Sequence, residues 1–367
     1  MLIEENNSSS ALRIQEGIEP PPQVNTEYLK KAVKRKPVQS PAYYIEGILS
    51  GNRTILSQAI TLVESALETH QVIAQSIIEG CLPHSGKSIR IGITGVPGVG
   101  KSTFIESFGM HLISCQHQVA VLAIDPSSQR SKGSILGDKT RMEKLSVHPK
   151  AYIRPSPSAG SLGGVARKTR ETVILCEAAG HDVIIIETVG VGQSETAVHS
   201  MVDFFLLLML AGAGDELQGI KRGIMEMADT LVINKADGDN LNKARQARIQ
   251  YESALHLFPL PPSGWAAHTA TCSALTGEGI PDIWDLISEY HRFTLSSGYF
   301  ENNRKNQSVS LMTETLNEAL TNSFMQAKGM KKILEETKIL VAQNKISPYT
   351  AAQNMLAAYF TDIRSKL

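Results

Sequence analysis

The sequence predicts an α/β fold in which a doubly wound, mostly parallel sheet carries helical extensions at both ends. Three observations support this prediction. Short apolar runs alternate with helical segments between residues 88 and 275. Several of these runs are rich in Val and Ile without polar alternation, as expected for strands covered on both faces. Amphipathic helical patterns precede and follow this region. Such alternation implies parallel strands joined by helical crossovers.

The elements divide the chain into four predicted segments. Residues 1–41 are rich in Ser, Pro and Lys and form a lead-in with no predicted packed structure. Residues 42–86 are helical, with one apolar stripe that includes Leu56, Ile60, Leu67 and Ile78. Residues 87–300 hold the sheet, and residues 301–367 form an amphipathic helical arm with no strand candidate.

Seven apolar runs are the strand candidates. They read "SIRIGITG", "VAVLAID", "AYIRP", "DVIIIET", "FFLLLML", "DTLVINK" and "TATCSA".

Composition excludes several classes of protein. The 367 residues are 42% apolar and 20% charged, and 36 basic residues balance 36 acidic ones. Because there is no global basic field, we expect no nucleic-acid partner. The four cysteines show no C-x-x-C spacing, so we expect reduced, mostly buried thiols. The histidines show no ligand spacing either, so we expect no metal cluster and no cobalamin cage.

The chain also lacks the sequence features of a membrane protein. Its N-terminus has no signal-peptide pattern. The most apolar run, "FFLLLMLAGAG", is shorter than the roughly 20 residues that a membrane-spanning helix needs. We therefore expect a soluble, cytoplasmic protein.

The stretch "GVPGVGKST" has the form of a phosphate-binding loop. Gly95, Gly100, Lys101 and Ser102 fit G-x-x-x-x-G-K-[ST], with a strand before and a helix after. The glycines let backbone N–H groups face an anion, and the helix adds its positive end. The full set of expected phosphate-binding residues is Gly95, Pro97, Gly98, Val99, Gly100, Lys101, Ser102 and Thr103. Kinases, ATPases and GTPases all share this loop.

The stretch "NKAD" favours guanine as the base. Asn234, Lys235 and Asp237 follow an apolar strand, at the edge of the sheet where ligands bind. A fixed Asp237 carboxylate accepts both guanine N1–H and the exocyclic amine, whereas adenine presents an acceptor there. An unpaired buried polar group of this kind supports discrimination of roughly 10⁴. Ser273, Ala274 and Leu275 of "CSALTGEG" are expected to clamp the base, so the predicted ligands are GTP and GDP.

Two acidic strand ends predict a magnesium site. Asp125 ends "VAVLAID" and Glu187 ends "DVIIIE", and with Ser102 they are the expected Mg²⁺ ligands. Either carboxylate could instead orient the attacking water. Gly190 is placed to sense the γ-phosphate through its N–H, so that the loop is released on hydrolysis.

Together these motifs resemble the MeaB/ArgK family of GTPases, which chaperone adenosylcobalamin-dependent methylmalonyl-CoA mutase. The likeness rests on "GVPGVGKST", "AIDPSS", "GSILGDKTRM", "GSLGGVARKT", "ETVGVGQSE", "GAGDELQGIKRGI" and "NKAD" in order, and it runs from about residue 42 to the C-terminus. It implies a P-loop GTPase domain over 87–300, a C-terminal arm that forms a homodimer, and roles for Lys101, Ser102, Asp125 and Glu187 at the phosphates.

The resemblance also implies three switch segments. The first spans "DPSSQRSKGSILGDKTRM", the second follows Glu187, and the third is "GDELQGIKRG", which responds to the mutase. In the third, Lys221 is a candidate for a cation that reaches the phosphates when a partner docks. A solvated charged loop is the equal alternative. Ser131 and Lys132 stand where the family usually has a small pair, which leaves the behaviour of the first switch open.

Two other functions compete with the chaperone GTPase. An ATP-dependent small-molecule kinase or transport-associated ATPase would use the same phosphate loop but would show no guanine preference. A targeting GTPase for membranes or ribosomes would carry a methionine-rich or basic module, which the C-terminal helices lack. Their apolar residues at spacings of three and four instead suit a helix-on-helix dimer.

Overall fold

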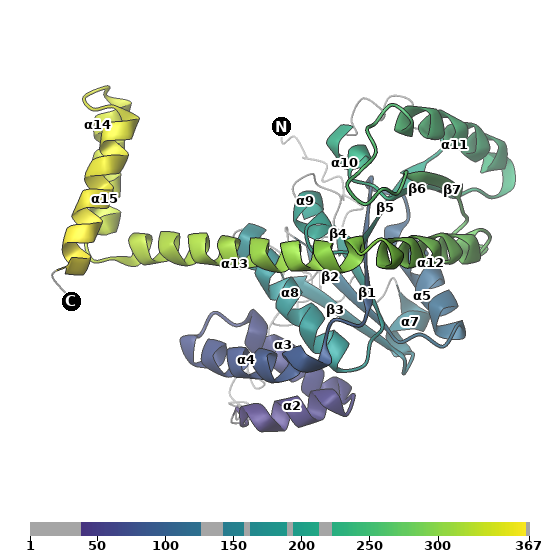
Figure 1. The fold of residues 1–367 in the computed structure, drawn as a ribbon, viewed down its shortest axis with the longest axis horizontal. Coiled ribbons are helices and arrows are strands. Elements are labelled where there is room, and N and C mark those ends of the chain that lie inside the picture. The colour runs from purple at the N-terminus through teal and green to yellow at the C-terminus, as the bar shows by residue number, and fades with distance from the viewer. Residues whose placement is uncertain (1–37, 126–141, 158–161, 189–193, 213–221, 365–367) are drawn as a thin grey trace, which may run out of the picture. The chain divides into compact units, whose positions relative to one another are not determined.

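A seven-stranded parallel sheet forms the centre of the protein (Figure 1). The structure is a computed structural model that describes residues 38–125, 142–157, 162–188, 194–212 and 222–364. The strand order is β3-β2-β4-β1-β5-β6-β7. The strands are β1 (Ile89–Gly95), β2 (Val119–Asp125), β3 (Ala151–Pro157), β4 (Val183–Thr188), β5 (Phe204–Leu210), β6 (Thr230–Asn234) and β7 (His268–Thr271).

All seven predicted strands are confirmed, and every neighbouring pair runs parallel. Two strands differ from their predicted runs by more than one residue at an end: β3 continues two residues beyond "AYIRP" to Pro157, and β7 ends at Thr271, so that Cys272 begins the loop that follows. Strands β1, β4, β5 and β6 are buried along nearly their whole length, so their apolar sequences reflect cover on both faces.

Helices cover both faces of the sheet (Figure 1). On one face Ile91 and Ile93 of β1 belong to a buried cluster with Phe104 and Phe108 of α5. On the other, Ile186 of β4 belongs to a cluster that includes residues of the N-terminal helices. The helices that follow or join the strands are α5 (Lys101–Ser114), α7 (Glu143–Val147), α8 (Leu162–Ala178), α9 (Ser194–His199), α10 (Arg222–Glu226), α11 (Leu241–Leu255) and α12 (Ile280–Ser296).

Three separate helices precede the sheet, whereas the sequence predicted one helical segment with a single apolar stripe. They are α2 (Pro41–Leu49), α3 (Arg53–Glu64) and α4 (Glu68–Cys81). Asn52 starts α3, because its side-chain oxygen accepts hydrogen bonds from the backbone N–H of Thr54 (3.0 Å) and Ile55 (3.2 Å). Leu67 stands at the N-cap of α4 and is 55% exposed, so its assignment to the buried stripe is wrong.

The C-terminal region is helical, as predicted. It comprises α13 (Tyr299–Gln326), α14 (Met330–Ala342) and α15 (Pro348–Arg364). Arg304 of α13 attaches this helix to the sheet: its guanidinium donates to both carboxylate oxygens of Asp203 (2.8 and 2.6 Å) and to the carbonyl oxygens of Gly86 and Ser88. Every helix in the described ranges is too short or too polar to cross a bilayer.

The free cysteines follow the prediction. Cys81, Cys176 and Cys272 are buried, and Cys115 is exposed. Burial raises the pKa of the Cys81 thiol to about 11 and that of the Cys272 thiol to about 12. These thiols are therefore protonated and packed as small apolar groups.

Candidate functional site

The predicted phosphate loop connects the end of β1 to the start of α5. A Cβ on Gly95 would lie 2.5 Å from the carbonyl oxygen of Leu208 in β5, so only glycine lets the loop leave the sheet here. Gly100 has a φ of 92°, and a Cβ there would lie 3.1 Å from the amide nitrogen of Asn234. Both glycines of the motif are therefore required by close approach or by backbone conformation.

Lys101 bends back over its own loop. Its Nζ donates to the carbonyl oxygen of Gly95 at 2.8 Å and lies 3.4 Å from that of Val96. Burial lowers the pKa of Lys101, while the charges of Glu187 and Glu195 oppose that shift. The ammonium group thus lies within electrostatic range of the β4 carboxylate that the sequence singled out.

Asn234 connects the phosphate loop to the predicted base-binding segments. It ends β6, is 1% exposed, and donates through Nδ2 to the carbonyl oxygen of Val99 at 2.9 Å. Its Oδ1 accepts from the backbone N–H of Ala274 at 3.1 Å. The thiol of Cys272 also lies 3.5 Å from that oxygen. One buried side chain therefore joins three separate segments of the chain.

Lys235 and Asp237 follow on the same loop. Lys235 has a φ of 59°, which is rare for a residue with a side chain, and its Nζ donates to the carbonyl oxygen of Gly98 at 2.9 Å. The hydroxyl of Ser273 donates to Oδ2 of Asp237. Among the described residues no hydrogen bond reaches the other carboxylate oxygen. The structure thus brings the two predicted base-binding stretches together.

The remaining phosphate-loop and clamp residues differ in exposure. Pro97 and Gly98 are exposed at the tip of the loop, Val99 is buried, Ser102 is half-buried and Thr103 is exposed. Leu275 is 82% exposed, unlike its buried neighbours Ser273 and Ala274. Leu275 touches little protein, so a role for it rests on contact with a ligand.

The acidic strand ends occupy neighbouring strands. Glu187 of β4 is 8% exposed and stands in register with Ile93 of β1 and Ala123 of β2. Asp125 ends β2, two residues beyond Ala123; its side chain lies outside what the structure describes. Within the described ranges, no three His, Cys, Asp or Glu side chains gather as a metal-binding group.

Sequence reasoning missed a buried hydroxyl pair beside this carboxylate. Thr188, which follows Glu187, donates to the hydroxyl of Thr94 at 2.8 Å, and both residues are buried. Thr94 immediately precedes Gly95, so the pair connects the ends of β4 and β1 at the start of the phosphate loop. Two threonines 94 residues apart give no sequence signal for such a contact.

Other predicted site residues lie outside the described ranges. These are Gly190 and Lys221, together with most of the three predicted switch segments (126–141, 189–193 and 213–221). Arg222, the neighbour of Lys221, begins α10, and its guanidinium lies 5.4 Å from the centre of the Phe258 ring.

Comparisons with known proteins identify the family of this chain. Residues 56–329 match the family model "Methylmalonyl Co-A mutase-associated GTPase MeaB". The chain is 46% identical to the "GTPase ArgK" of Escherichia coli, covering 85% of this chain and 94% of that protein. It is 45% identical to the mouse "Methylmalonic aciduria type A homolog, mitochondrial", covering 85% of this chain and 78% of that protein.

A solved structure shares the fold. The crystal structure of a "LAO/AO transport system kinase" is 40% identical, with a TM-score of 0.71, over 86% of this chain and 96% of that one. The predicted P-loop GTPase fold and the resemblance drawn from the sequence are both confirmed. The family match extends over well more than half of the residues and includes both the phosphate loop and the "NKAD" segment. The chain therefore belongs to the MeaB family of methylmalonyl-CoA mutase-associated GTPases.

Proposed function

We propose that this GTPase acts in the cytoplasm as a chaperone of adenosylcobalamin-dependent methylmalonyl-CoA mutase, gating the loading of the cofactor and protecting the mutase. The family description, which names association with that mutase, supports this assignment. The mouse relative, named for methylmalonic aciduria, also supports it. Hydrolysis of GTP is slow in the isolated protein and faster when the mutase is bound. GTP hydrolysis acts on the mutase by ordering or releasing the switch loops and by changing their contacts with the mutase.

The guanine-binding assignment rests on Asp237 and its neighbours. The Ser273 hydroxyl holds one carboxylate oxygen of Asp237 and thereby restricts the rotation of the side chain. The carboxylate accepts N1–H and the exocyclic amine of guanine, and the stem of Lys235 lies along the ring. Asn234 supports the base site through its bond to Val99. This connection is the single observation that carries the proposal, because it couples base recognition to the phosphate loop.

At the phosphate end of the proposed site, each polar side chain has its own role. Lys101 exchanges its bonds with the loop carbonyls for the β and γ phosphates. The oxygen donors of Ser102, Asp125 and Glu187 match the ligand preference of Mg²⁺, which supplies charge neutralisation on the phosphates. The buried position of Glu187 beside β1 fits that role. Gly190 senses the γ-phosphate, and Lys221 is the candidate for a cation that moves in when the mutase docks.

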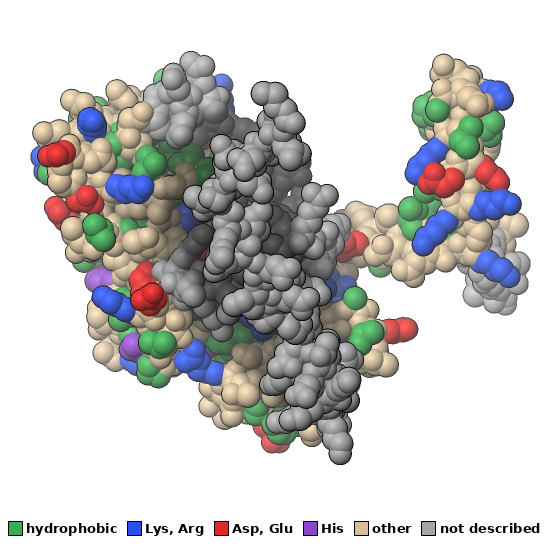
Figure 2. All heavy atoms as spheres, turned by 180° about the vertical axis from the view of Figure 1, so that it is seen from behind, with side chains coloured by type: hydrophobic (Ala, Val, Ile, Leu, Met, Phe, Trp, Pro, Cys, Tyr) green, Lys and Arg blue, Asp and Glu red, His purple; other side chains and the backbone are tan. Residues whose placement is uncertain are grey.

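A homodimer through the C-terminal arm belongs to the same proposal. On α13, Val309, Met312, Leu316 and Leu320 are 59%, 64%, 56% and 56% exposed. Their spacings of three and four residues place them on one helical stripe. Figure 2 shows hydrophobic side chains beside charges of both signs over the C-terminal helices. A second copy of the chain would cover such a stripe, which is costly to leave in water.

We retain the four predicted segments as the functional units. These are the lead-in 1–41, the helical segment 42–86, the GTPase domain 87–300 and the dimerisation arm 301–367. In the structure α13 begins at Tyr299, so the last boundary falls at the start of one continuous helix.

Co-purification with methylmalonyl-CoA mutase, followed by measurement of GTP turnover, tests the proposal. The expected result is a stable complex in which the mutase raises the turnover rate at least tenfold. The Lys101→Ala variant is the negative control, because it removes the phosphate-binding cation and should show no turnover with or without the mutase. A complex that forms without any change in turnover would contradict the proposed switch. An equal preference for ATP would instead favour the alternative ATP-dependent kinase or transport-associated ATPase.

A further inference from the structure

Three aspartates, at the amino ends of β4, β5 and β6, hold the sheet together in the same way. Each precedes its strand and accepts a hydrogen bond from a backbone N–H of an adjacent segment. The pairs are Asp182 with Gln118 (2.7 Å), Asp203 with Arg90 (2.8 Å) and Asp229 with Phe205 (2.8 Å). This edge of the sheet lies opposite the phosphate loop, because the loop follows the carboxyl end of β1.

Two of the three carboxylates also have a cationic or imidazole partner. Asp203 pairs with Arg304 at 2.6 Å, and Asp182 pairs with His117 at 2.8 Å. For Asp229, no Lys, Arg or His of the described ranges lies within the 4.0 Å of an ion pair. Asp229 is therefore the one member of this set that lacks a positive partner in the described part of the chain.

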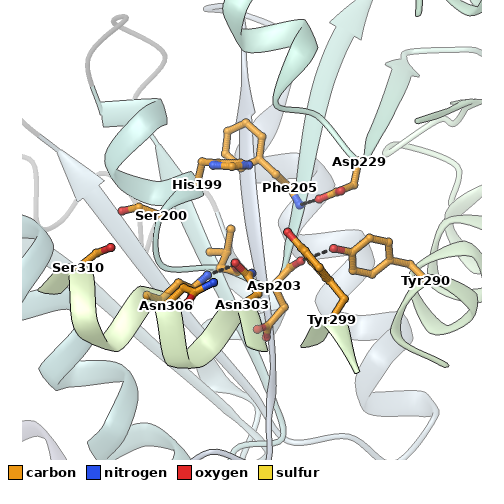
Figure 3. A pocket seen from close by; sticks show the side chains of 12 residues that line it. His199, Ser200, Asp203, Phe205, Asp229, Tyr290, Tyr299, Asn303, Asn306 and Ser310 are labelled. Atoms are coloured by element: carbon orange, nitrogen blue, oxygen red, sulfur yellow. Dashed lines mark hydrogen bonds between the residues drawn. The ribbon is translucent and has the colours of Figure 1, made fainter. Parts of the chain in front are cut away.

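Asp229 instead lines two adjoining cavities of about 240 and 380 Å³. Three residues, His199, Asp229 and Tyr299, line both cavities, so the two adjoin and are together called the paired cavity. Figure 3 shows the smaller cavity, with the side chains of the sheet edge on one side and those of α13, including Asn303 and Asn306, on the other. No Lys or Arg lines either cavity.

The charged groups that line these cavities favour the binding of a cation. Besides Asp229 they are lined by two further carboxylates, those of Asp203, which Arg304 neutralises, and Glu226. Burial raises the pKa of Asp229 to about 7, and the charge of Asp203 adds to this shift. Two imidazoles also line the cavities: burial lowers the pKa of His199, so this ring adds no positive charge at neutral pH, and His256 lines only the larger cavity. A cation placed beside Asp229 would favour its ionised form.

The other lining groups suit a cation carried on an apolar stem. Phe205, Tyr290 and Tyr299 present aromatic surface to the smaller cavity. Gln307 uses its amide nitrogen to donate to the carbonyl oxygen of Val202 at 2.8 Å, which fixes the orientation of its side chain. Its Oε1 is buried and has no hydrogen-bond donor among the described residues. The site therefore offers acceptors and aromatic rings, which is the complement of a group rich in N–H donors.

We propose that the paired cavity binds a small organic cation, a primary ammonium or guanidinium group on a short apolar stem, with its N–H groups on the carboxylate of Asp229 and its stem against Phe205, Tyr290 and Tyr299. The combined space exceeds what one short alkyl chain fills, so the natural ligand carries a second polar group that reaches the amides of α13. The site is separate from the nucleotide site and does not depend on GTP hydrolysis.

Calorimetric titration of the full chain at pH 8 tests this proposal, in phosphate rather than an amine buffer. The probes are n-butylamine and n-butylguanidine, with 1-butanol as the neutral comparator. We expect saturable binding of at least one cation and at least tenfold weaker binding of the alcohol. Absence of saturation with both cations, or equal binding of the alcohol, overturns the proposal.

Two variants locate the binding. Asp229→Asn keeps an oxygen that can accept from Phe205 and should weaken binding of the cation at least tenfold. Asp182→Asn is the matched control, because it changes the equivalent carboxylate at another strand and should leave the affinity unchanged. GDP affinity, measured for every variant, reports folding. Unchanged affinity in Asp229→Asn, or an equal loss in Asp182→Asn, contradicts the assignment.

The wild-type protein provides a second test that needs no substitution. Both probes remain cationic between pH 6 and pH 8, whereas Asp229, with a pKa of about 7, ionises in this range. Affinity should therefore rise roughly tenfold from pH 6 to pH 8, in proportion to the ionised fraction of the carboxylate. Affinity that is independent of pH in this range overturns the proposal.

Discussion

Asn234 donates a hydrogen bond from its side-chain amide to the backbone carbonyl oxygen of Val99 at 2.9 Å, across 135 residues of sequence. The same side chain accepts from the backbone N–H of Ala274 at 3.1 Å. Both bonds are buried, where an unpaired partner is costly. The phosphate loop, the end of β6 and the loop after β7 are therefore positioned by one amide group.

Replacing Asn234 by Ala should weaken binding of GTP and GDP together. The substitution leaves the Val99 carbonyl and the Ala274 N–H without their partner, and each loss costs about 1–3 kcal/mol. We expect at least a tenfold increase in the dissociation constant of a fluorescent GDP analogue. Asn317→Ala, on an exposed part of α13, is the control and should bind normally. Normal affinity in Asn234→Ala would show that the two loops are positioned independently.

Asp237→Asn should change the preferred base from guanine to xanthine. The carboxamide can donate to the 2-oxygen of xanthine but repels the exocyclic amine of guanine. Competition binding with GTP and XTP should show at least a hundredfold loss for GTP and a gain for XTP. Ser273→Ala, which removes only the bond that holds Asp237, should give a smaller loss without changing the preferred base. Retained GTP selectivity in Asp237→Asn would remove this residue from the base site.

Arg304→Ala should strongly destabilise the protein. The variant leaves the Asp203 carboxylate, which is 2% exposed, without its cation, and breaking such a buried pair costs about 3–5 kcal/mol. Chemical unfolding should show this loss. Lys332→Ala is the matched control: its ion pair with Glu336 is long, at 3.8 Å, and exposed, so it should cost less than about 1 kcal/mol. Equal effects of the two substitutions would mean that the buried pair contributes nothing beyond a surface one.

Charges placed on the exposed stripe of α13 should prevent self-association. In the double variant Leu316→Asp/Leu320→Asp, pairing two copies would bury four carboxylates against apolar surface. Sedimentation velocity should show a dimer for the wild-type protein and a monomer for the variant. Val147→Asp, which changes an apolar side chain that is 78% exposed on α7, should leave the dimer intact. A dimer that survives the double variant would place the interface elsewhere.

The pKa of Asp229 predicts a specific dependence of stability on pH. Burial raises this pKa from 3.8 to about 7, so the folded protein keeps a proton that the unfolded chain loses between about pH 4 and pH 7. The contribution of Asp229 to the free energy of unfolding therefore falls as pH rises through this window.

Asp229→Asn cannot ionise and should remove this contribution. Urea unfolding at pH 5 and pH 7.5 should show a smaller fall in stability, or a rise, relative to the wild type. Parallel pH profiles for the two proteins would contradict the raised pKa of Asp229.

The sequence predicts the strands and the motif residues of the site, because each of these depends on a short stretch of the chain. The strands were recognisable because each is a short apolar run, and Lys101 and Asp237 because their motifs fix residue types at short spacings. The two breaks in the N-terminal helical segment, at residues 50–52 and 65–67, were missed. Residues 50–52 read Ser-Gly-Asn, which are turn and cap residue types, but the prediction rested on the apolar stripe that begins at Leu56 and so did not locate the Asn52 cap.

Contacts between distant segments gave no comparable signal. Arg304 and Asp203 are 101 residues apart, and Thr188 and Thr94 are 94 apart. Nothing in either local sequence distinguishes these side chains from exposed ones. In the sequence Asp229 is an ordinary polar residue at the start of an apolar run, and only the three-dimensional structure shows that no described cationic side chain pairs with it.

Strand β1 is held at both ends by side chains that have different tasks. Gly95, at its last residue, lies beneath the ammonium group of Lys101, while Arg304 holds the carbonyl of Ser88 immediately before its first. The seven residues of β1, Ile89–Gly95, are hydrogen-bonded to β4 and β5 and span about 23 Å. Arg304 belongs to α13, so the segment that leads into β1 is hydrogen-bonded directly to this helix. The strand that leads into the phosphate loop and the helix that begins the C-terminal arm are therefore held together by one guanidinium group.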